Sequence, residues 1–162
     1  MKNSLKLVRL SDALLVTLAL TIVAATPAEE KAFTDKFKAA MEGNDTTTLE
    51  GFLYTEGSDR HALEIYKMML QRETELLRQF GNAGGQFTTN IELVSLTPED
   101  VKKAMTPEEG PTGKYCLNLT PTKKLVIKLE HKDAISSGSS TSEYFVAEKE
   151  GKLVISVHGP CK

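Results

Sequence analysis

The fold is decided by residues 58–96, SDRHALEIYKMMLQRETELLRQFGNAGGQFTTNIELVSL, because the hydrophobic period of this stretch changes once, beyond its middle. The first part repeats apolar side chains at helical spacing, which predicts one long amphipathic helix from Ser58 or Asp59 to Phe80. The last part, residues 86–96, alternates apolar and polar side chains, which predicts a strand with one buried face. A helix of this kind followed by strands indicates an α+β domain, with the helix packed on a sheet.

Two shorter helices are predicted before this stretch. Residues 29–42 place apolar side chains at helical spacing. A second, short helix follows, for which Thr47 and Glu50 form a capping box. After the first strand, Thr97 and Asp100 form a similar box and predict one or two further helical turns. The chain is therefore expected to begin with two to three helices.

The rest of the chain is predicted to form strands joined by loops. Residues 106–113 and the Ser/Gly-rich residues 133–142 are the predicted loops. Alternating apolar side chains predict two strands between them. The first of these strands contains Tyr115, Leu117 and Leu119, and the second contains Leu125, Ile127 and Leu129.

A final hairpin is predicted to join residues 143–149 to residues 152–158. Its turn is Glu150-Gly151, where glycine supplies the positive φ of a tight turn. The sequence thus predicts a single α+β domain, residues 29–162, in which two to three N-terminal helices pack on an antiparallel sheet of four to five strands.

The first residues follow the order of a secretory signal peptide. Lys2, Lys6 and Arg9 form a positive segment, and residues 13–25 form an uncharged apolar run. This run has 13 residues, whereas a spanning helix needs roughly 20, so a stable membrane span is the weaker interpretation. Residues 1–28 are predicted to be removed, and the mature protein is expected to be secreted or periplasmic.

Two cleavage positions fit this signal peptide. The cut could follow Ala25, with Val23 three positions before it, or it could follow Ala28. The second position is favoured because it leaves a short polar segment between the apolar run and the cut.

The charge balance argues against nucleic acid as a partner. Removal of residues 1–28 changes the count from 20 basic and 22 acidic side chains to 17 and 21, which gives a net charge of −4. Nucleic-acid binding needs a basic face, and anionic lipid attracts a polybasic patch. Neither is expected here.

The chain has two cysteines, Cys116 and Cys161. An even number in an oxidising compartment predicts one disulfide, which would tie the C-terminal tail to a strand in the middle of the domain. Two free, buried thiols are the alternative.

Two segments at the ends of the domain resemble small exported members of the nuclear transport factor 2-like superfamily, which has a cystatin-like α+β fold. They are AFTDKFKAAMEGNDTTTLEGFL, residues 32–53, and YFVAEKEGKLVISV, residues 144–157. Leu153 departs from the pattern, because that position is usually aromatic. The resemblance implies a strongly curved sheet around the long helix and a cone-shaped cavity, used as an isomerase or dehydratase site, a ligand pocket or a protein contact surface.

Glu73 is the main candidate for chemistry. On a helical wheel it falls near the middle of the apolar arc of the long helix. A carboxylate there must be paired, protonated or open to a cavity, because a lone buried charge is costly. Tyr115, His131 or a strand lysine are the expected partners. The alternatives to a general base are a satisfied internal pair and a solvated carboxylate at an overhanging helix end.

The other candidates lie around the same predicted cavity. Tyr66 and Met69 share the apolar arc with Glu73, and with Tyr115 these three form the predicted ligand-binding set. Met68 and Met69 are also expected to be core residues. Of the histidines other than His131, His61 is expected on the solvated side of the helix, and His158 is expected to be structural or exposed.

The sequence lacks the spacing of a metal site, a phosphate-binding loop or a nucleophile motif, so no metal and no cofactor is expected. The leading expectation is a non-enzymatic exported module that binds a small apolar ligand or an envelope partner protein in the cavity. The alternative is a small acid–base isomerase or lyase that uses Glu73 with Tyr115 or His131. A homodimer is left open, although the outward Lys124 and Lys128 argue against an apolar outer sheet face.

Overall fold

The computed structural model describes residues 25–82, 86–110, 113–132 and 137–161. Residues 1–24 of the predicted signal peptide therefore lie outside the described residues. Within the described ranges, three helices precede the first strand and a fourth follows it. They are α1 (Pro27–Glu42), α2 (Thr46–Glu50), α3 (Arg60–Asn82) and α4 (Pro98–Ala104).

The described strands form two antiparallel sheets. The larger sheet has the order β1-β4-β5-β6 and the smaller has the order β2-β3-β7. The larger contains β1 (Gln86–Ser95), β4 (Lys123–Lys132), β5 (Ser137–Lys149) and β6 (Lys152–Ile155). The smaller contains β2 (Glu108–Gly110), β3 (Gly113–Leu117) and β7 (His158–Pro160).

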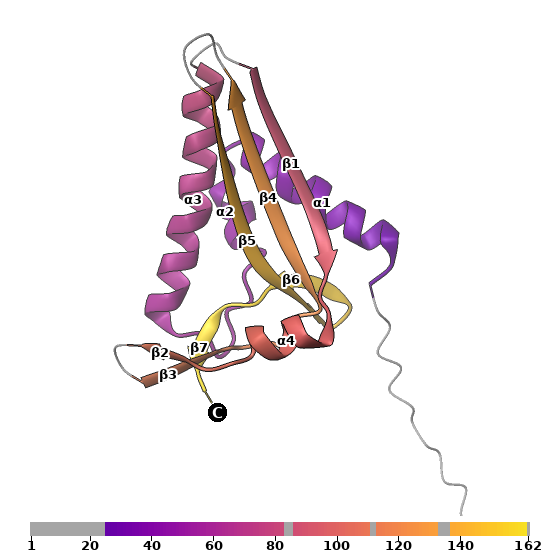
Figure 1. Cartoon of the computed structure of the whole chain (residues 1–162), viewed down its shortest axis with the longest axis vertical. Helices are drawn as coiled ribbons and strands as arrows, with labels where there is room; N and C mark the ends of the chain where they lie inside the picture. The colour runs from indigo at the N-terminus through magenta and orange to yellow at the C-terminus, as the bar shows by residue number, and fades with distance from the viewer. Residues whose placement is uncertain (1–24, 83–85, 111–112, 133–136, 162) are drawn as a thin grey trace, which may run out of the picture.

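The segment between β6 and β7 links the two sheets, and together they form a curled assembly. Ser156 N donates to Phe145 O at 2.8 Å, and Asn118 N donates to Val157 O at 2.9 Å. Consecutive residues thus bond first to the larger sheet and then to the β3 side. Figure 1 shows α3 standing beside β5 and β4, with the smaller sheet and α4 at the base. The curled antiparallel sheet with helices confirms the predicted α+β class.

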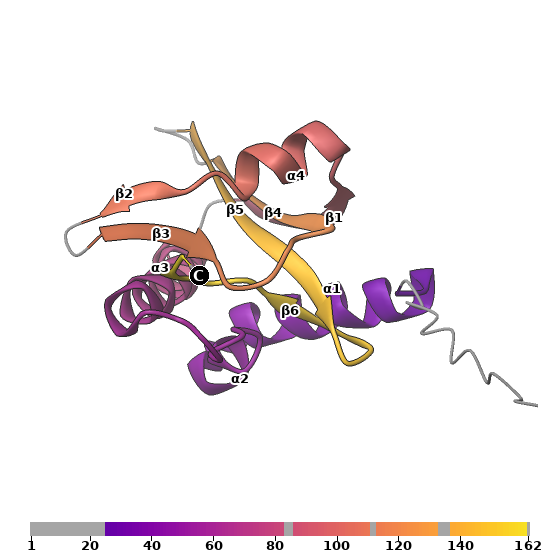
Figure 2. The same ribbon diagram turned by 90° about the horizontal axis from the view of Figure 1, so that it is seen from below.

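The core lies between β4 and the helices. Leu125, Ile127 and Leu129 point to one face of β4 and are buried, because alternate residues of a strand share a face. They belong to one cluster with side chains from α1, α2, α3, β5 and the end of the chain. The aromatic rings of this cluster include Phe37 of α1 and Phe52, whose centroids lie 5.2 Å apart. Figure 2 shows α1 and α2 together on one side of the sheet.

The buried face of α3 differs from the predicted arc. Leu70, Glu73 and Thr74 are buried, whereas Met69 is 39% exposed and Met68 is 61% exposed. The prediction that these two methionines are core residues is therefore wrong. The helix turns its face with Leu70 toward the core, because α3 also packs against α1 and α2 beside the sheet.

Capping residues fix the ends of the helices. Thr97 and Asp100 form the predicted capping box of α4. The box predicted for α2 is wrong, because Asp45 is the N-cap and accepts from Thr48 N at 3.0 Å. Asp59 caps α3, as its Oδ1 accepts from the backbone nitrogens of the second and third helical residues. The helix α3 is assigned through Asn82, two residues beyond its predicted end.

Two predicted loops contain strand residues. Residues 106–113 include β2, which pairs with β3, and residues 137–142 of the Ser/Gly-rich segment extend β5 along β4. The prediction of a single sheet is also wrong, because the described strands form two sheets and β3 belongs to the smaller one. Small polar residues form a strand here because β4 offers a full row of backbone partners. The prediction of a loop at 133–136 lies outside the described residues.

Local backbone geometry supports the smaller sheet and the last hairpin. Glu150 and Gly151 both have positive φ, 52° and 72°, which is the geometry of a two-residue hairpin turn. Gly159 has no room for a side chain, because a Cβ there would collide with the backbone oxygen of Gly57. Strand β7 therefore lies directly against the segment that leads into α3. No helix in the described part of the chain has the length and apolarity needed to cross a membrane.

The predicted disulfide is confirmed. Cys116 and Cys161 are bonded, with their α-carbons 5.0 Å apart. Cys116 lies opposite Gly159 in the pairing of β3 with β7, and Cys161 N donates to Lys114 O at 3.2 Å. The bond therefore holds the end of the chain against β3 and fixes the smaller sheet.

We expect the double substitution Cys116→Ser and Cys161→Ser to lower the free energy of unfolding by about 4 kcal/mol, because it opens a loop in the unfolded chain whose ends are 45 residues apart. Urea denaturation of the oxidised protein and of the variant measures this difference. Equal midpoints would show that the bond adds no stability.

Candidate functional site

Glu73 is buried between α3 and β5. Its exposed fraction is 6%, and its Oε1 accepts a hydrogen bond from Ser142 Oγ. Ser142 lies opposite Ile127 in the sheet, so its side chain belongs to the row that faces the core. Tyr115, His131 or a lysine was the predicted partner of Glu73. Ser142 was not predicted, because residues 133–142 were assigned to a loop.

Two buried polar groups in this region have unmet hydrogen-bonding capacity. Glu73 Oε2 and the hydroxyl of Tyr144 are both buried and have no hydrogen-bond partner among the described residues. Burial, with a smaller contribution from the negative charge of Glu73, raises the pKa of Tyr144. We call Glu73, Ser142 and Tyr144 the interior polar cluster. Within this cluster, the hydrogen bond from the Ser142 hydroxyl offsets part of the free-energy cost of burying the Glu73 carboxylate.

We expect Ser142→Ala to lower the free energy of unfolding by about 1–3 kcal/mol, because it leaves a buried carboxylate oxygen without its donor. Ser140→Ala is the matched control, since Ser140 is an exposed serine on the same strand and should change stability by less than about 0.5 kcal/mol. Chemical denaturation of both variants compares them. An equal, small effect would mean that the Ser142 bond contributes nothing.

A separate cleft of about 210 Å³ lies between the start of α3 and the smaller sheet. Ala62, Ile65 and Tyr66 line it from α3, and Tyr115 lines it from β3. Strand β7 lies against the segment before α3 at Gly159, and His158 of β7 lines the cleft together with residues of β2 and β3. The walls of the cleft are mostly apolar and aromatic, as in sites that hold small molecules.

Tyr66, His158 and Glu108 form a polar chain across this cleft. The Tyr66 hydroxyl lies 3.1 Å from His158 Nδ1, and His158 Nε2 lies 3.9 Å from Glu108 Oε2. Burial, with a smaller contribution from the negative charge of Glu108, raises the pKa of Tyr66 to about 12. The phenol is therefore protonated at neutral pH and can donate to His158 Nδ1 in the tautomer that leaves this nitrogen without a proton.

The ring of Tyr115 lies directly against Gly110. A Cβ at Gly110 would collide with the edge of this ring, so the aromatic wall needs glycine at that position. Tyr115 also lies opposite Glu108 in the pairing of β2 with β3. The same short hairpin thus supplies an aromatic surface and a carboxylate to the cleft.

The charged side chains in the cleft are mostly acidic. Asp59, Glu108 and Glu109 line it together with His61 and His158, and no lysine or arginine is among the described lining residues. Glu109 lies 3.7 Å from Lys114, but both side chains are largely exposed, so solvent screens this pair. Nowhere in the described residues are three or more His, Cys, Asp or Glu side chains arranged to hold a metal ion.

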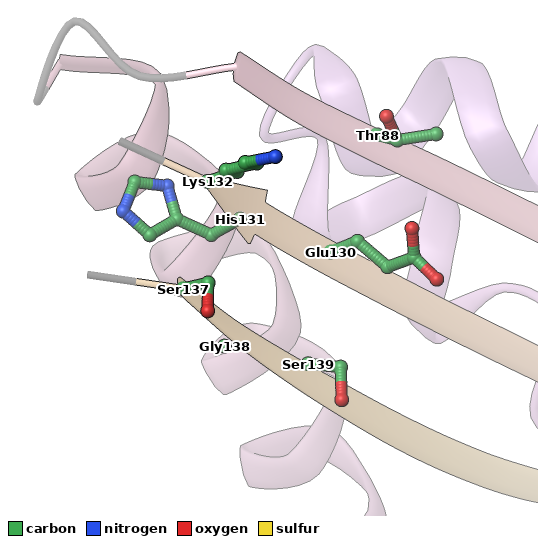
Figure 3. A pocket seen from close by; sticks show the side chains of 7 residues that line it. All are labelled: Thr88, Glu130, His131, Lys132, Ser137, Gly138 and Ser139. Carbon is green, nitrogen blue, oxygen red and sulfur yellow. The ribbon is translucent and has the colours of Figure 1, made fainter. Parts of the chain in front are cut away.

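A second, larger hollow of about 490 Å³ lies at the far ends of β1, β4 and β5. Figure 3 shows Thr88, Glu130 and Ser139 side by side on one face of these strands, whereas His131 points away from Glu130. The lining residues of this hollow are polar apart from Gly138 and include both a glutamate and a lysine, whereas sites for small ligands are lined mainly by apolar and aromatic side chains. We therefore take the cleft beside α3 as the candidate functional site.

The structure brings together some of the predicted site residues and separates others. Tyr66 and Tyr115 share the cleft. Glu73 does not line it, and it lies seven residues, about 10 Å of helix, beyond Tyr66. His131 is buried but lies at the hollow of Figure 3, four residues, about 13 Å, along β4 from the residue opposite Ser142.

Met69 is exposed and is not in the lining of the cleft.

Glu108 and His158 line the cleft but were not predicted from the sequence as site residues. The parity of the last predicted strand gave His158 an outward direction, but the chain leaves the larger sheet before this residue and begins β7. The alternation of the last predicted strand therefore does not give the direction of the His158 side chain.

Comparison of the chain with protein-family models, with curated proteins and with solved structures finds no match.

Proposed function

We propose that this chain is an exported binding module that holds a small ligand in the cleft between α3 and the smaller sheet. The observation that carries the proposal is the pairing of Tyr66 and Tyr115 across a cleft with apolar walls and a few polar groups. Such a combination supports binding, because aromatic walls supply contact area and polar groups fix orientation.

The export part of the proposal rests on the leader sequence and the disulfide. An apolar run after three basic residues is the order of a signal peptide. The Cys116–Cys161 bond suits an oxidising compartment, such as the periplasm or the cell exterior. The curled sheet beside a long helix also supports a place in the nuclear transport factor 2-like superfamily, which remains a proposal.

The start of α1 favours one of the two predicted cleavage positions. Thr26 is the N-cap, and its backbone nitrogen and hydroxyl donate to Glu29 Oε2 at 2.7 and 2.8 Å. Cleavage after Ala28 would remove this cap, which contributes about 1 kcal/mol in typical helices. Cleavage after Ala25 would keep it.

We therefore expect the exported protein to begin at Thr26. Intact-mass measurement and N-terminal sequencing of protein recovered from the periplasm or the medium test this. A mature chain that begins at Glu29, or one that keeps its leader, would contradict the expectation.

An acid–base enzyme built on Glu73 has less support. Its carboxylate is buried against Ser142, and neither it nor Ser142 lines the cleft. A general base must reach the proton that it removes from a substrate. The arrangement therefore supports a structural role for Glu73 and a binding role for the cleft.

Benzyl alcohol is a suitable neutral probe of the cleft, because it combines one aromatic ring with one polar group. In a titration followed by NMR, we expect saturable shifts of the backbone amides of Ala62, Ile65, Tyr66 and Tyr115. Gly110→Ala should remove most of this response, because the added methyl group displaces the Tyr115 ring.

Gly138→Ala is the matched control, since a Cβ there has nothing within 4 Å, and this variant should bind as the wild type does. Shifts spread over the whole protein, or an equal response in both variants, would place binding elsewhere and overturn the proposal.

A further inference from the structure

The cleft has a charge pattern that narrows the class of its ligand. Tyr66 and Tyr115 line a space that Glu108 also lines, and Glu108 lies opposite Tyr115 in the pairing of β2 with β3. The negative charge of Glu108 acts on the phenol of Tyr66, which indicates that its field reaches into the cleft. A positive group is therefore favoured there and a negative group is disfavoured.

We infer that the ligand is a small organic ammonium ion, with its charge between the rings of Tyr66 and Tyr115 and the carboxylate of Glu108. This inference rests on the proposed function of the cleft. The face of an aromatic ring attracts a cation through its quadrupole, and a carboxylate at the edge adds a direct Coulomb attraction. The volume of about 210 Å³ is below the roughly 300–1,000 Å³ of pockets for drug-sized ligands, so the ligand has few heavy atoms.

The start of α3 does not reverse this preference. A helix N-terminus usually favours an anion, because its free N–H groups and dipole are positive. Here Asp59 Oδ1 already accepts from His61 N at 2.9 Å and Ala62 N at 3.0 Å. The protein's own carboxylate thus takes the place of an external anion.

Different elements position the two rings and the charge. Tyr66 is positioned by α3 and by its contact with His158, 3.1 Å away. Tyr115 is positioned by β3 and by the bare backbone of Gly110. Glu108 is largely exposed and lies 3.9 Å from His158 Nε2, so Glu108→Gln removes the charge while it keeps a polar side chain of the same length beside His158.

Choline and its neutral isostere 3,3-dimethylbutan-1-ol test the inference, because they have the same shape and differ in one charge. We expect choline to bind in the cleft of the full mature protein at least about fivefold more tightly than the isostere. Choline affinity should also fall when salt rises from about 0.01 to about 0.5 M, because salt screens exposed charges.

Glu108→Gln should weaken choline binding about fivefold and leave the isostere unchanged. Glu92→Gln is the matched control, since Glu92 is an exposed carboxylate on β1, outside the cleft, and choline affinity should stay as in the wild type. Tyr115→Leu should weaken choline by about two- to fivefold through loss of the ring face.

The outcomes separate the two proposals. If benzyl alcohol or the isostere binds in the cleft as tightly as choline, the cation preference is overturned and the binding cleft stands. If benzyl alcohol, choline and the isostere all leave the cleft resonances unshifted, both proposals fail. If Glu92→Gln weakens choline as much as Glu108→Gln does, the effect is one of overall charge and the cation site is overturned.

Discussion

The structure depends on the burial of one face of β4 against the helices. Leu125, Ile127 and Leu129 are almost fully buried in a row, and the same strand pairs along its whole length with β1 and β5. A one-residue shift in either pairing would move this row to the solvent side. The register of the larger sheet, and with it the position of α3, is therefore set by the apolar contact of β4.

The smaller sheet is placed by polar contacts and by the disulfide. The side chain of Asn118 donates to Tyr54 O at 2.8 Å and to Ser58 Oγ at 3.0 Å, and its oxygen accepts from Val157 N at 3.0 Å. One amide thus joins the segment before α3 to the segment that leads into β7. With the Cys116–Cys161 bond, it holds the smaller sheet at the base of α3 (Figure 1). The cleft lies between this sheet and the start of α3.

The interior polar cluster and the cleft have different physical characters. The interior polar cluster is closed, and its carboxylate is stabilised by a single serine among the described residues. The cleft is open to solvent at its acidic edge, while its tyrosines are partly buried. Charge in the first site affects mainly stability, whereas charge in the second can act on a ligand. This difference is why we connect function with Tyr66 and Tyr115 and stability with Glu73.

The sequence by itself predicted the helices, the capping box of α4, most of the strands, the place of Glu73 on the apolar arc of α3 and, as the favoured alternative, the pairing of the cysteines. These features depend on periodicity and on residue chemistry close along the chain. Only the tertiary structure decided that Ser142 meets Glu73, that Met69 faces outward and that His158 and Glu108 join Tyr66. Those contacts depend on how a strand leaves one sheet for another and how a helix rotates on its neighbours, and side chains distant in the sequence set both.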